Sequence, residues 1–194
     1  MEKNVFMCGS TSGFGLCLAE VFSKEFNIIL NGRKNNPDFT TVIKDMNDLQ
    51  IEDFQKFNPN IIVNNGFDKK NYIHSFEGSL NVVKKSMEYF TQKGEGIIIN
   101  INSFYGLNPD KKDPDYSAAK YGLRGYIESI SEKAFNNRIR IMNIYPRAMK
   151  TGLNDGRSDF EDLIDPYEVS ELILNMAKSK SFYVGSIQID RIKI

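Results

Sequence analysis

Short apolar runs rich in β-branched residues constrain the fold more than any other feature of the sequence. These runs cover residues 5–7, 28–30, 61–63, 97–99, 139–142 and 183–184. Each run is too short for a helix but long enough for a buried strand. Between several of them, apolar residues recur at helical spacing, within 16–26, 80–90, 123–134 and 169–176. Strands that alternate with helices predict an α/β fold, a doubly wound parallel sheet with helices on both faces.

Length and composition fit one globular domain over residues 1–194. Apolar residues make up 41% of the chain, which is too high for a disordered protein. Basic and acidic residues balance at 25 each, so the basic excess of a nucleic-acid binder is missing. The apolar runs are too short to span a membrane and the first residues do not resemble a signal peptide, so we expect a cytoplasmic protein. Two cysteines and one histidine predict no metal site.

A glycine-rich turn follows the first predicted strand and precedes a helix. Its spacing is Gly-x-x-x-Gly-x-Gly, over the residues Gly9, Ser10, Thr11, Ser12, Gly13, Phe14 and Gly15. Glycines let a backbone approach a pyrophosphate closely, and the free N–H groups at a helix start attract its charge. The turn therefore predicts a dinucleotide site, and the alternative is a tight turn without a ligand.

The second predicted strand ends in a basic pair, Arg33 and Lys34, with no carboxylate beside it. In dinucleotide folds a carboxylate at this point accepts from a ribose 2′-hydroxyl, whereas arginine suits a 2′-phosphate. Arg33 thus favours NADP(H) over NAD(H). The alternative is a solvated basic turn.

Tyr116 and Lys120 share one face of a predicted helix, because they lie four residues apart. The pattern Tyr-x-x-x-Lys is weak by itself, and Tyr89 with Lys93 repeats it. Context separates the two pairs: Tyr89 lies in the middle of a helix, whereas Tyr116 follows a strand whose end carries Ser103. The pair formed by Tyr116 and Lys120 is therefore the catalytic candidate.

These motifs together resemble the short-chain dehydrogenase/reductase family. The resemblance rests on the glycine-rich turn, Asn64-Asn65-Gly66, Ser103, Tyr116-x-x-x-Lys120 and the segment from Pro146 to Thr151, in that order over residues 3–151. It implies a Rossmann-like sheet. The chain departs from the family by its shorter length, by the lack of room for a helix between Arg33 and Thr41, and by a short segment at 152–165.

The resemblance implies a catalytic role for four residues. Tyr116 would be the general acid/base, and Ser103 would orient the substrate oxygen. Lys120 would hold the nicotinamide ribose and, together with an oxidised nicotinamide, lower the pKa of Tyr116. Asn81 corresponds to an asparagine that anchors a proton-relay water.

Further residues would contact the cofactor in a protein of this family. They are Asn65 and Gly66 beside the adenosine half, Asp45 at the adenine, and Pro146 and Thr151 over the nicotinamide amide. The alternative for Asp45 is a helix cap. Arg147 stands where the family has glycine, and it predicts recognition of a carboxylate or phosphate on the substrate, or else a solvent-facing residue. Phe104 and Tyr105 would form an apolar wall over the substrate, or belong to the core.

The sequence therefore predicts an NADP(H)-dependent oxidoreductase that interconverts a carbonyl and a secondary alcohol, with a small-molecule substrate. By analogy with the family, it predicts a homodimer or homotetramer that pairs helices 78–91 and 116–135 across a two-fold axis. The alternative is a catalytically silent NADP(H)-binding sensor or scaffold. A sugar-nucleotide epimerase or dehydratase uses the same Tyr and Lys, but these enzymes carry a C-terminal substrate domain that the sequence lacks.

Overall fold

One parallel sheet organises the chain, for which the computed structural model describes residues 3–68 and 70–192. The described residues form seven strands in the order β3-β2-β1-β4-β5-β6-β7. Their bounds are β1 Asn4–Cys8, β2 Asn27–Gly32, β3 Thr40–Ile43, β4 Ile61–Asn64, β5 Gly96–Ile101, β6 Ile139–Pro146 and β7 Ser186–Ile189. The strand order reverses between β1 and β4, which places the expected ligand crevice at the carboxyl ends of these two strands. The predicted doubly wound parallel sheet is confirmed.

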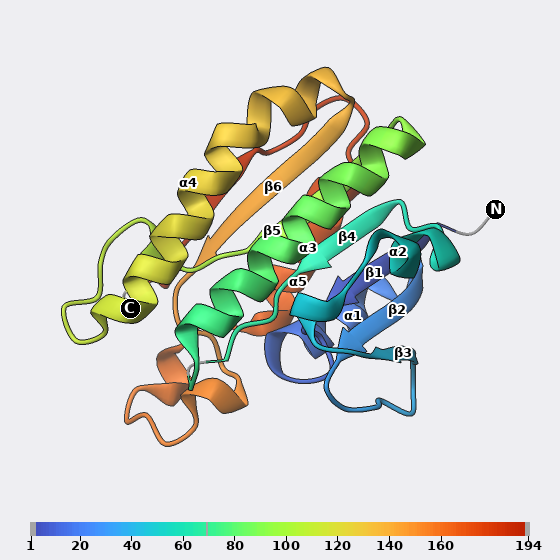
Figure 1. Ribbon diagram of the computed structural model, residues 1–194. Helices are drawn as coiled ribbons and strands as arrows, with labels where there is room; N and C mark the ends of the chain where they lie inside the picture. The colour runs from blue at the N-terminus through green and yellow to red at the C-terminus, as the bar shows by residue number, and fades with distance from the viewer. Residues whose placement is uncertain (1–2, 69, 193–194) are drawn as a thin grey trace.

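Helices cover both faces of this sheet (Figure 1). Helices α1 (Gly13–Phe22) and α5 (Pro166–Lys178) pack on one face, and α2 (Ile51–Phe57), α3 (Tyr72–Lys93) and α4 (Pro114–Asn136) pack on the other. The strands are apolar on both faces for this reason. In β1, Val5 and Met7 join the core beneath α1, whereas Phe6 and Cys8 join the core beneath α2 and α3.

A row of buried asparagines crosses the sheet at the carboxyl ends of three strands. Asn64 of β4, Asn100 of β5 and Asn143 of β6 lie in register and are at most 2% exposed. The Asn64 amide donates to Asn100 Oδ1 at 2.8 Å, and the Asn100 amide donates to Asn143 Oδ1 at 2.7 Å. The Asn143 amide then donates to the Tyr145 hydroxyl at 2.5 Å. This asparagine row satisfies polar groups that water cannot reach, and it requires the three strands to keep one register.

The structure corrects two expectations about secondary structure. Residues 183–184, predicted as a strand, precede β7, and Tyr183 is 38% exposed. The last strand, β7, lies at the edge of the sheet and pairs with β6 alone. Its residues are exposed or half-buried, so its sequence lacks the apolar run that marks a buried strand. Helix α2 was not predicted, because its seven residues span too few turns to show a periodicity. No helix occupies residues 33–39 within the described chain, as expected.

Two further features bear on expectations from the sequence. Cys8 is fully buried, and burial raises the pKa of its thiol far above the ordinary value, so it is a core residue and not a reactive thiol. None of the helices in the described part of the chain is both long and apolar enough to cross a bilayer.

The asparagine row predicts a large loss of stability for Asn100→Leu. Leucine fills a similar volume but removes both side-chain hydrogen bonds of Asn100 in the row. The Asn143 oxygen then loses its donor and the Asn64 amide keeps only its bond to the Ser79 carbonyl, which together costs about 2–4 kcal/mol. Urea unfolding followed by circular dichroism measures this cost. Asn108→Leu, at an exposed position, is the control and should stay within about 0.5 kcal/mol of the wild type. Equal losses for both variants would contradict the role of the row.

Candidate active site

The glycine-rich turn has the geometry of an anion cradle. Gly9 has a φ of +66°, and a Cβ built on it would lie 2.1 Å from the Cα of Gly66, so no larger residue fits there. Gly13, with a φ of +57°, begins α1. The Ser12 side chain does not cap this helix, and its first turn carries no acidic residue. The first N–H groups of α1 therefore stay available for a phosphate, and the positive end of the helix dipole faces it.

Other residues of the turn hold its shape. Ser10 is fully buried, and its hydroxyl donates to the Cys8 carbonyl. Phe14 packs into the core beneath α1, and the amide of Asn65 donates to the Gly9 carbonyl at 3.0 Å. Thr11 is partly exposed and Ser12 exposed. Of the predicted contacts in the turn, Thr11 and Ser12 are thus accessible to a ligand, whereas the side chains of Ser10 and Phe14 are buried and support the turn.

Arg33 lies past the end of β2 and forms an ion pair with Asp68, with 3.1 Å between the nearest nitrogen and oxygen. The Lys70 N–H, with the Arg33 guanidinium, lowers the pKa of Asp68. Asp68 follows β4, so the ion pair connects the segments that follow the second and fourth strands. Arg33 thus already has a carboxylate partner, which sequence reasoning missed.

Asp45 lies at the end of the connection that follows β3. Its carboxylate caps the short 3-10 helix Met46–Asp48 by accepting from Asn47 N at 3.0 Å, and it lies 3.1 Å from His74 Nε2. Burial alone would raise the pKa of Asp45, but the hydrogen bonds from Asn47 and His74 outweigh it and lower the pKa. The helix-cap alternative therefore describes Asp45 in the free protein.

Ser103, Tyr116 and Lys120 come together at the carboxyl end of β5. Ser103 lies just past this strand, is 8% exposed, and accepts from Tyr105 N through its hydroxyl oxygen. Tyr116 lies in the first turn of α4, where the Asp113 carboxylate caps the helix by accepting from Tyr116 N at 3.1 Å. The Ser103 side chain hydrogen-bonds the Tyr116 side chain. A phenol, a hydroxyl and an ammonium are thus gathered at one strand end.

Lys120 is 3% exposed, and among the described residues no carboxylate pairs with its ammonium. Burial lowers the pKa of Lys120 to about 7. Burial also raises the pKa of Tyr116 above its ordinary value, although the hydrogen bond from Ser103 opposes this. That Lys120 and an oxidised nicotinamide together lower the pKa of Tyr116 stays a prediction, and in the protein alone this pKa is raised.

The Lys120 ammonium lies against the rings of Phe67 and Tyr116, and sequence reasoning passed over Phe67. The ammonium lies 4.1 Å from the ring centre of Phe67 and 5.7 Å from that of Tyr116. Phe67 also meets the Tyr116 ring edge-on at 5.2 Å, and Tyr72 lies 5.8 Å from the same ring. Its position in the sequence, directly after Asn64-Asn65-Gly66, could have indicated that Phe67 lies at the site. Faces of aromatic rings stabilise a cation, but they supply none of the acceptors that an ammonium requires.

Asn81 lies apart from this cluster, which corrects the role expected for it. It belongs to α3, and its amide nitrogen lies within 3.3 Å of three carbonyl oxygens, those of Met46, Asn47 and Leu49. These carbonyls belong to the segment between β3 and α2. Asn81 therefore fastens that segment to α3 and does not anchor a water beside Lys120.

The second Tyr-x-x-x-Lys pair has an ordinary structural role. The Tyr89 hydroxyl donates to Asn58 Oδ1 at 2.9 Å, and the Lys93 ammonium donates to the Pro59 carbonyl at 2.6 Å. Both bonds tie the C-terminal part of α3 to the loop before β4. The structure thus separates the two pairs in the way that the sequence context predicted.

Arg147 packs on Phe104, the residue after Ser103, and its guanidinium is already engaged. Its guanidinium lies 3.5 Å from the ring centre of Phe104, and its Nε is 2.5 Å from a carboxylate oxygen of Asp190. The Tyr105 ring lies 6.1 Å from that of Tyr116, so Phe104 and Tyr105 do border the cluster. Asp190, which follows β7, is a partner that the sequence did not reveal.

Pro146 and Thr151 lie on the segment that leaves β6 for this edge. Pro146 ends the strand and is buried, and Thr151 is partly exposed at the start of the 3-10 helix Gly152–Asn154. The site as a whole offers a glycine cradle, an uncapped helix start and a buried ammonium for which the described residues supply no acceptor. These features fit a nicotinamide dinucleotide, whose pyrophosphate needs N–H donors and whose ribose hydroxyls can accept from an ammonium.

Comparisons with known proteins agree with this geometry. A family model described as short chain dehydrogenase matches residues 67–162. A 3-alpha-(or 20-beta)-hydroxysteroid dehydrogenase of Mycobacterium bovis is 32% identical over 114 residues, which cover 56% of this chain and 42% of that protein. A D-beta-hydroxybutyrate dehydrogenase of Rhizobium meliloti is 24% identical over 94% of this chain and 86% of the relative. The chain thus matches less than half the length of the mycobacterial relative.

Solved structures share the fold at lower identity. The structure titled ElxO with NADP bound superposes with a TM-score of 0.82 at 18% identity, covering 98% of both chains. A 3-ketoacyl-(acyl-carrier-protein) reductase from Brucella melitensis, complexed with NADH, gives 0.81 at 19% identity, over 97% of this chain and 96% of that one. At these identities the likeness supports the fold alone.

The buried ammonium predicts a pH-dependent gain in stability for Lys120→Met. The pKa of Lys120 is about 7 in the folded protein and 10.5 when exposed. Between these values the unfolded chain binds a proton that the folded protein lacks, so the free energy of unfolding of the wild type rises with pH. Below pH 7 the folded wild type bears the whole burial penalty, and Lys120→Met should be more stable by about 3 kcal/mol.

This difference should shrink as the pH rises from 7 towards 10, and urea unfolding across that range measures it. Lys112→Met, at an exposed lysine, is the matched control, whose difference from the wild type should not change with pH in this way. A pH-independent difference for Lys120→Met would show that the ammonium is solvated and would contradict the site as described.

Proposed function

Because the chain belongs to the short-chain dehydrogenase/reductase family, we propose that it is an NADP(H)-dependent oxidoreductase that interconverts a carbonyl and a secondary alcohol. One observation carries the proposal. Ser103, Tyr116 and Lys120 meet at the carboxyl end of β5, beside the crevice where the strand order reverses. A proton donor, a second hydrogen-bond donor and a cation then surround one point, where a substrate oxygen can be held.

Two elements of the chain would hold the phosphates and the adenosine half of the cofactor. The glycine turn from Gly9 to Gly15 would receive the pyrophosphate through its N–H groups, and Asn65 and Gly66 would border the adenosine. Asp45 would contact the adenine. The nicotinamide, when bound, supplies the hydride chemistry.

Lys120 would donate from its ammonium to the nicotinamide ribose hydroxyls, which would replace Phe67 as its neighbour. Pro146 and Thr151 would border the nicotinamide amide. Acceptors at the ammonium favour its protonated form, so they raise the pKa of Lys120 from about 7. A fixed positive charge beside Tyr116 then opposes the burial that raises the pKa of this phenol.

In the reaction, Tyr116 would pass its phenolic proton to the carbonyl oxygen in reduction and recover it in oxidation. Ser103 would donate to the same oxygen and hold it in place. Its oxygen accepts from Tyr105 N, and its proton is directed at the Tyr116 side chain in the free protein, so the substrate oxygen would take the place of Tyr116 as the acceptor of this proton. Together the two donors stabilise the charge that develops on this oxygen.

Phe104 and Tyr105 would form one wall of the substrate site, because both border the catalytic cluster. Recognition of a substrate carboxylate or phosphate by Arg147 is a further hypothesis. It requires the substrate anion to compete with Asp190 for the guanidinium. The substrate is thus proposed only as a small carbonyl or alcohol.

A catalytically silent NADP(H)-binding sensor or scaffold is the second candidate. The Phe67 ring against the Lys120 ammonium favours it, because this ring lies where an acceptor is needed for catalysis. The presence of all three catalytic side chains at one strand end opposes it. Turnover by the wild type on a panel of carbonyls, or its absence, decides between the two.

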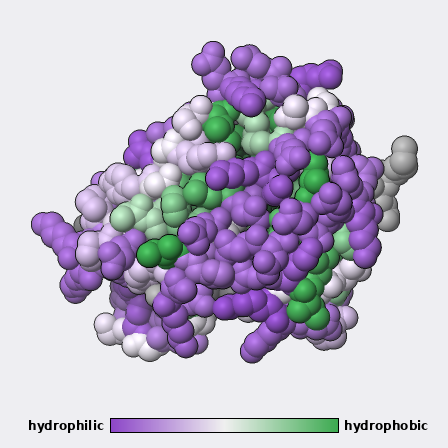
Figure 2. Space-filling view, viewed as in Figure 1, coloured by the Kyte–Doolittle hydropathy of each residue, from purple (hydrophilic) through white to green (hydrophobic). Residues whose placement is uncertain are grey.

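A homodimer or homotetramer in the cytoplasm completes the proposal. Helices α3 and α4 would form the pairing face, and Phe135 of α4 is 62% exposed. Figure 2 shows the face that carries these helices as mostly hydrophilic, with hydrophobic residues in small separate areas. An interface there would therefore be largely polar.

Tyr116→Phe should abolish turnover and leave cofactor binding intact. The variant lacks the phenolic proton that Tyr116 would pass to the substrate but keeps the ring that packs on Phe67, so we expect a loss of about 10²–10⁴-fold in kcat. NADPH oxidation followed at its absorption band measures this loss, with Tyr89→Phe as the control. Retained turnover in Tyr116→Phe would exclude the proposed acid/base.

Arg33→Ala should weaken NADPH and spare NADH. Loss of one guanidinium contact to a 2′-phosphate corresponds to about tenfold in Kd, measured by isothermal titration calorimetry with each cofactor. Asp68→Asn, which releases Arg33 from its ion pair, should instead tighten NADPH by about twofold to fivefold. Equal losses for the two cofactors in Arg33→Ala would remove Arg33 from the phosphate site.

A further inference from the structure

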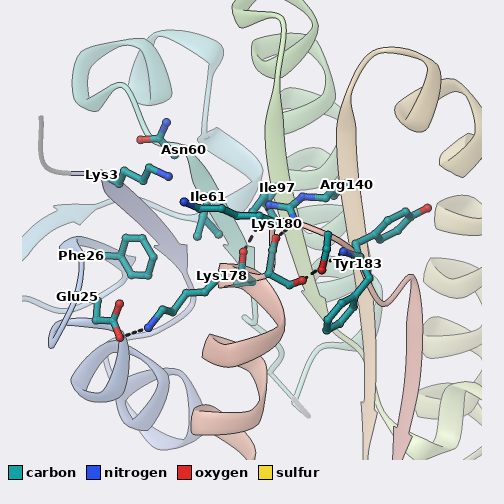
Figure 3. A pocket seen from close by; sticks show the side chains of 14 residues that line it. Lys3, Glu25, Phe26, Asn60, Ile61, Ile97, Arg140, Lys178, Lys180 and Tyr183 are labelled. Carbon is teal, nitrogen blue, oxygen red and sulfur yellow. Dashed lines mark hydrogen bonds and ion pairs between the residues drawn. The ribbon is translucent and has the colours of Figure 1, made fainter.

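A second cavity lies at the opposite edge of the sheet, where the strands begin (Figure 3). Its volume is about 770 Å³, within the range of small-molecule sites. Lys3, Asn60 and Arg140 line it from the amino ends of β1, β4 and β6, and the segment 177–183 after α5 closes one side. The proposed function uses none of these residues. β1 alone separates this edge from the glycine turn by about 16 Å, at the usual rise per residue.

The floor of the cavity is apolar. Ile61 and Ile97, which are 2% and 8% exposed, contribute the ends of β4 and β5, and Phe26 adds an aromatic face. Phe182 stands at the rim and is 61% exposed. A large exposed aromatic ring beside an apolar floor gives an apolar ligand body two surfaces to contact.

The charges around the cavity are unbalanced. Four cations line it, Lys3, Arg140, Lys178 and Lys180, against one carboxylate, that of Glu25. Lys178 pairs with Glu25, and Arg140 donates to the Ser179 carbonyl at 2.8 Å. In the described part of the chain, Lys3 and Lys180 have no carboxylate partner. Their side chains extend toward one another in Figure 3.

Two ammonium groups that converge without an anion repel each other, and an anion between them removes the repulsion. We propose that this cavity binds a small amphiphilic anion. Its phosphate or carboxylate head lies between Lys3 and Lys180, and its apolar body lies on Ile61, Ile97 and Phe26. The ligand is chemically distinct from a dinucleotide, and both can bind at once because the two sites occupy opposite edges of the sheet.

Isothermal titration calorimetry of the full chain tests this proposal, with octyl phosphate, inorganic phosphate and octanol as separate probes. Octyl phosphate should bind below its micellar concentration, and saturating NADPH should not change its Kd. Inorganic phosphate and octanol should each bind at least about tenfold more weakly, because each supplies only half of the contacts. Competition between octyl phosphate and NADPH would overturn the proposal by assigning the probe to the cofactor crevice.

Variants locate the site. The double variant Lys3→Gln with Lys180→Gln should weaken octyl phosphate by about tenfold, and Phe182→Ala by about threefold. Lys111→Gln with Lys112→Gln is the matched control, which removes two exposed lysines outside the cavity and should leave binding unchanged. Thermal unfolding of each variant checks that it is folded. If both double variants weakened octyl phosphate binding equally, the effect would come from the net charge of the protein and not from this cavity, which would overturn the proposal.

Binding to lipid vesicles distinguishes a soluble anionic ligand from a membrane surface. Co-sedimentation with phosphatidylcholine vesicles that contain phosphatidic acid, together with no binding of monomeric octyl phosphate, would overturn the proposal in favour of membrane attachment. Absence of binding in every arm would also overturn it. None of these outcomes depends on turnover, so they are distinguishable from a failure of the proposed oxidoreductase activity.

Discussion

Hydrogen bonds between the buried side chains of Asn64, Asn100 and Asn143 join β4, β5 and β6 in one register, and the site depends on this constraint. A shift of any strand by one residue would leave amide groups without partners inside the sheet. The fixed register places the residues that follow each strand at one edge. Asn65 after β4 then reaches the glycine turn, and Ser103 after β5 reaches the first turn of α4.

A buried ammonium, for which the described part of the chain supplies no hydrogen-bond acceptor, distinguishes this edge of the sheet. The Lys120 ammonium lies against the rings of Phe67 and Tyr116, and burial alone moves its pKa to about 7. In the free protein, burial therefore destabilises the Lys120 ammonium and raises the pKa of the Tyr116 phenol. Hydroxyl acceptors that bind to Lys120 would stabilise the ammonium, and the ammonium would in turn lower the pKa of Tyr116. In this account, cofactor binding and activation of Tyr116 are one process, and Phe67 covers the ammonium until then.

The alternation of strands and helices predicted the sheet, and the order of the motifs predicted Ser103, Tyr116 and Lys120 together. Both properties are local in sequence or follow from where strand ends meet. The partners of charged residues were not predictable in this way. Asp68 beside Arg33, and Asp190 beside Arg147, come from distant segments, and no periodicity marks them. The role predicted for Asn81 differs from its observed contacts for the same reason. Its three carbonyl partners lie on a loop whose path depends on the tertiary fold.

Titration of the wild-type protein with NADPH, followed by the fluorescence of the nicotinamide itself, tests the central claim most directly. The chain contains no tryptophan, so its own emission interferes little. The account predicts saturable binding with enhanced emission, because the carboxyl edge carries both the glycine cradle and the Lys120 ammonium. An emission that stays unchanged up to millimolar protein would contradict it, and would mean that the Lys120 ammonium and the glycine cradle serve no dinucleotide.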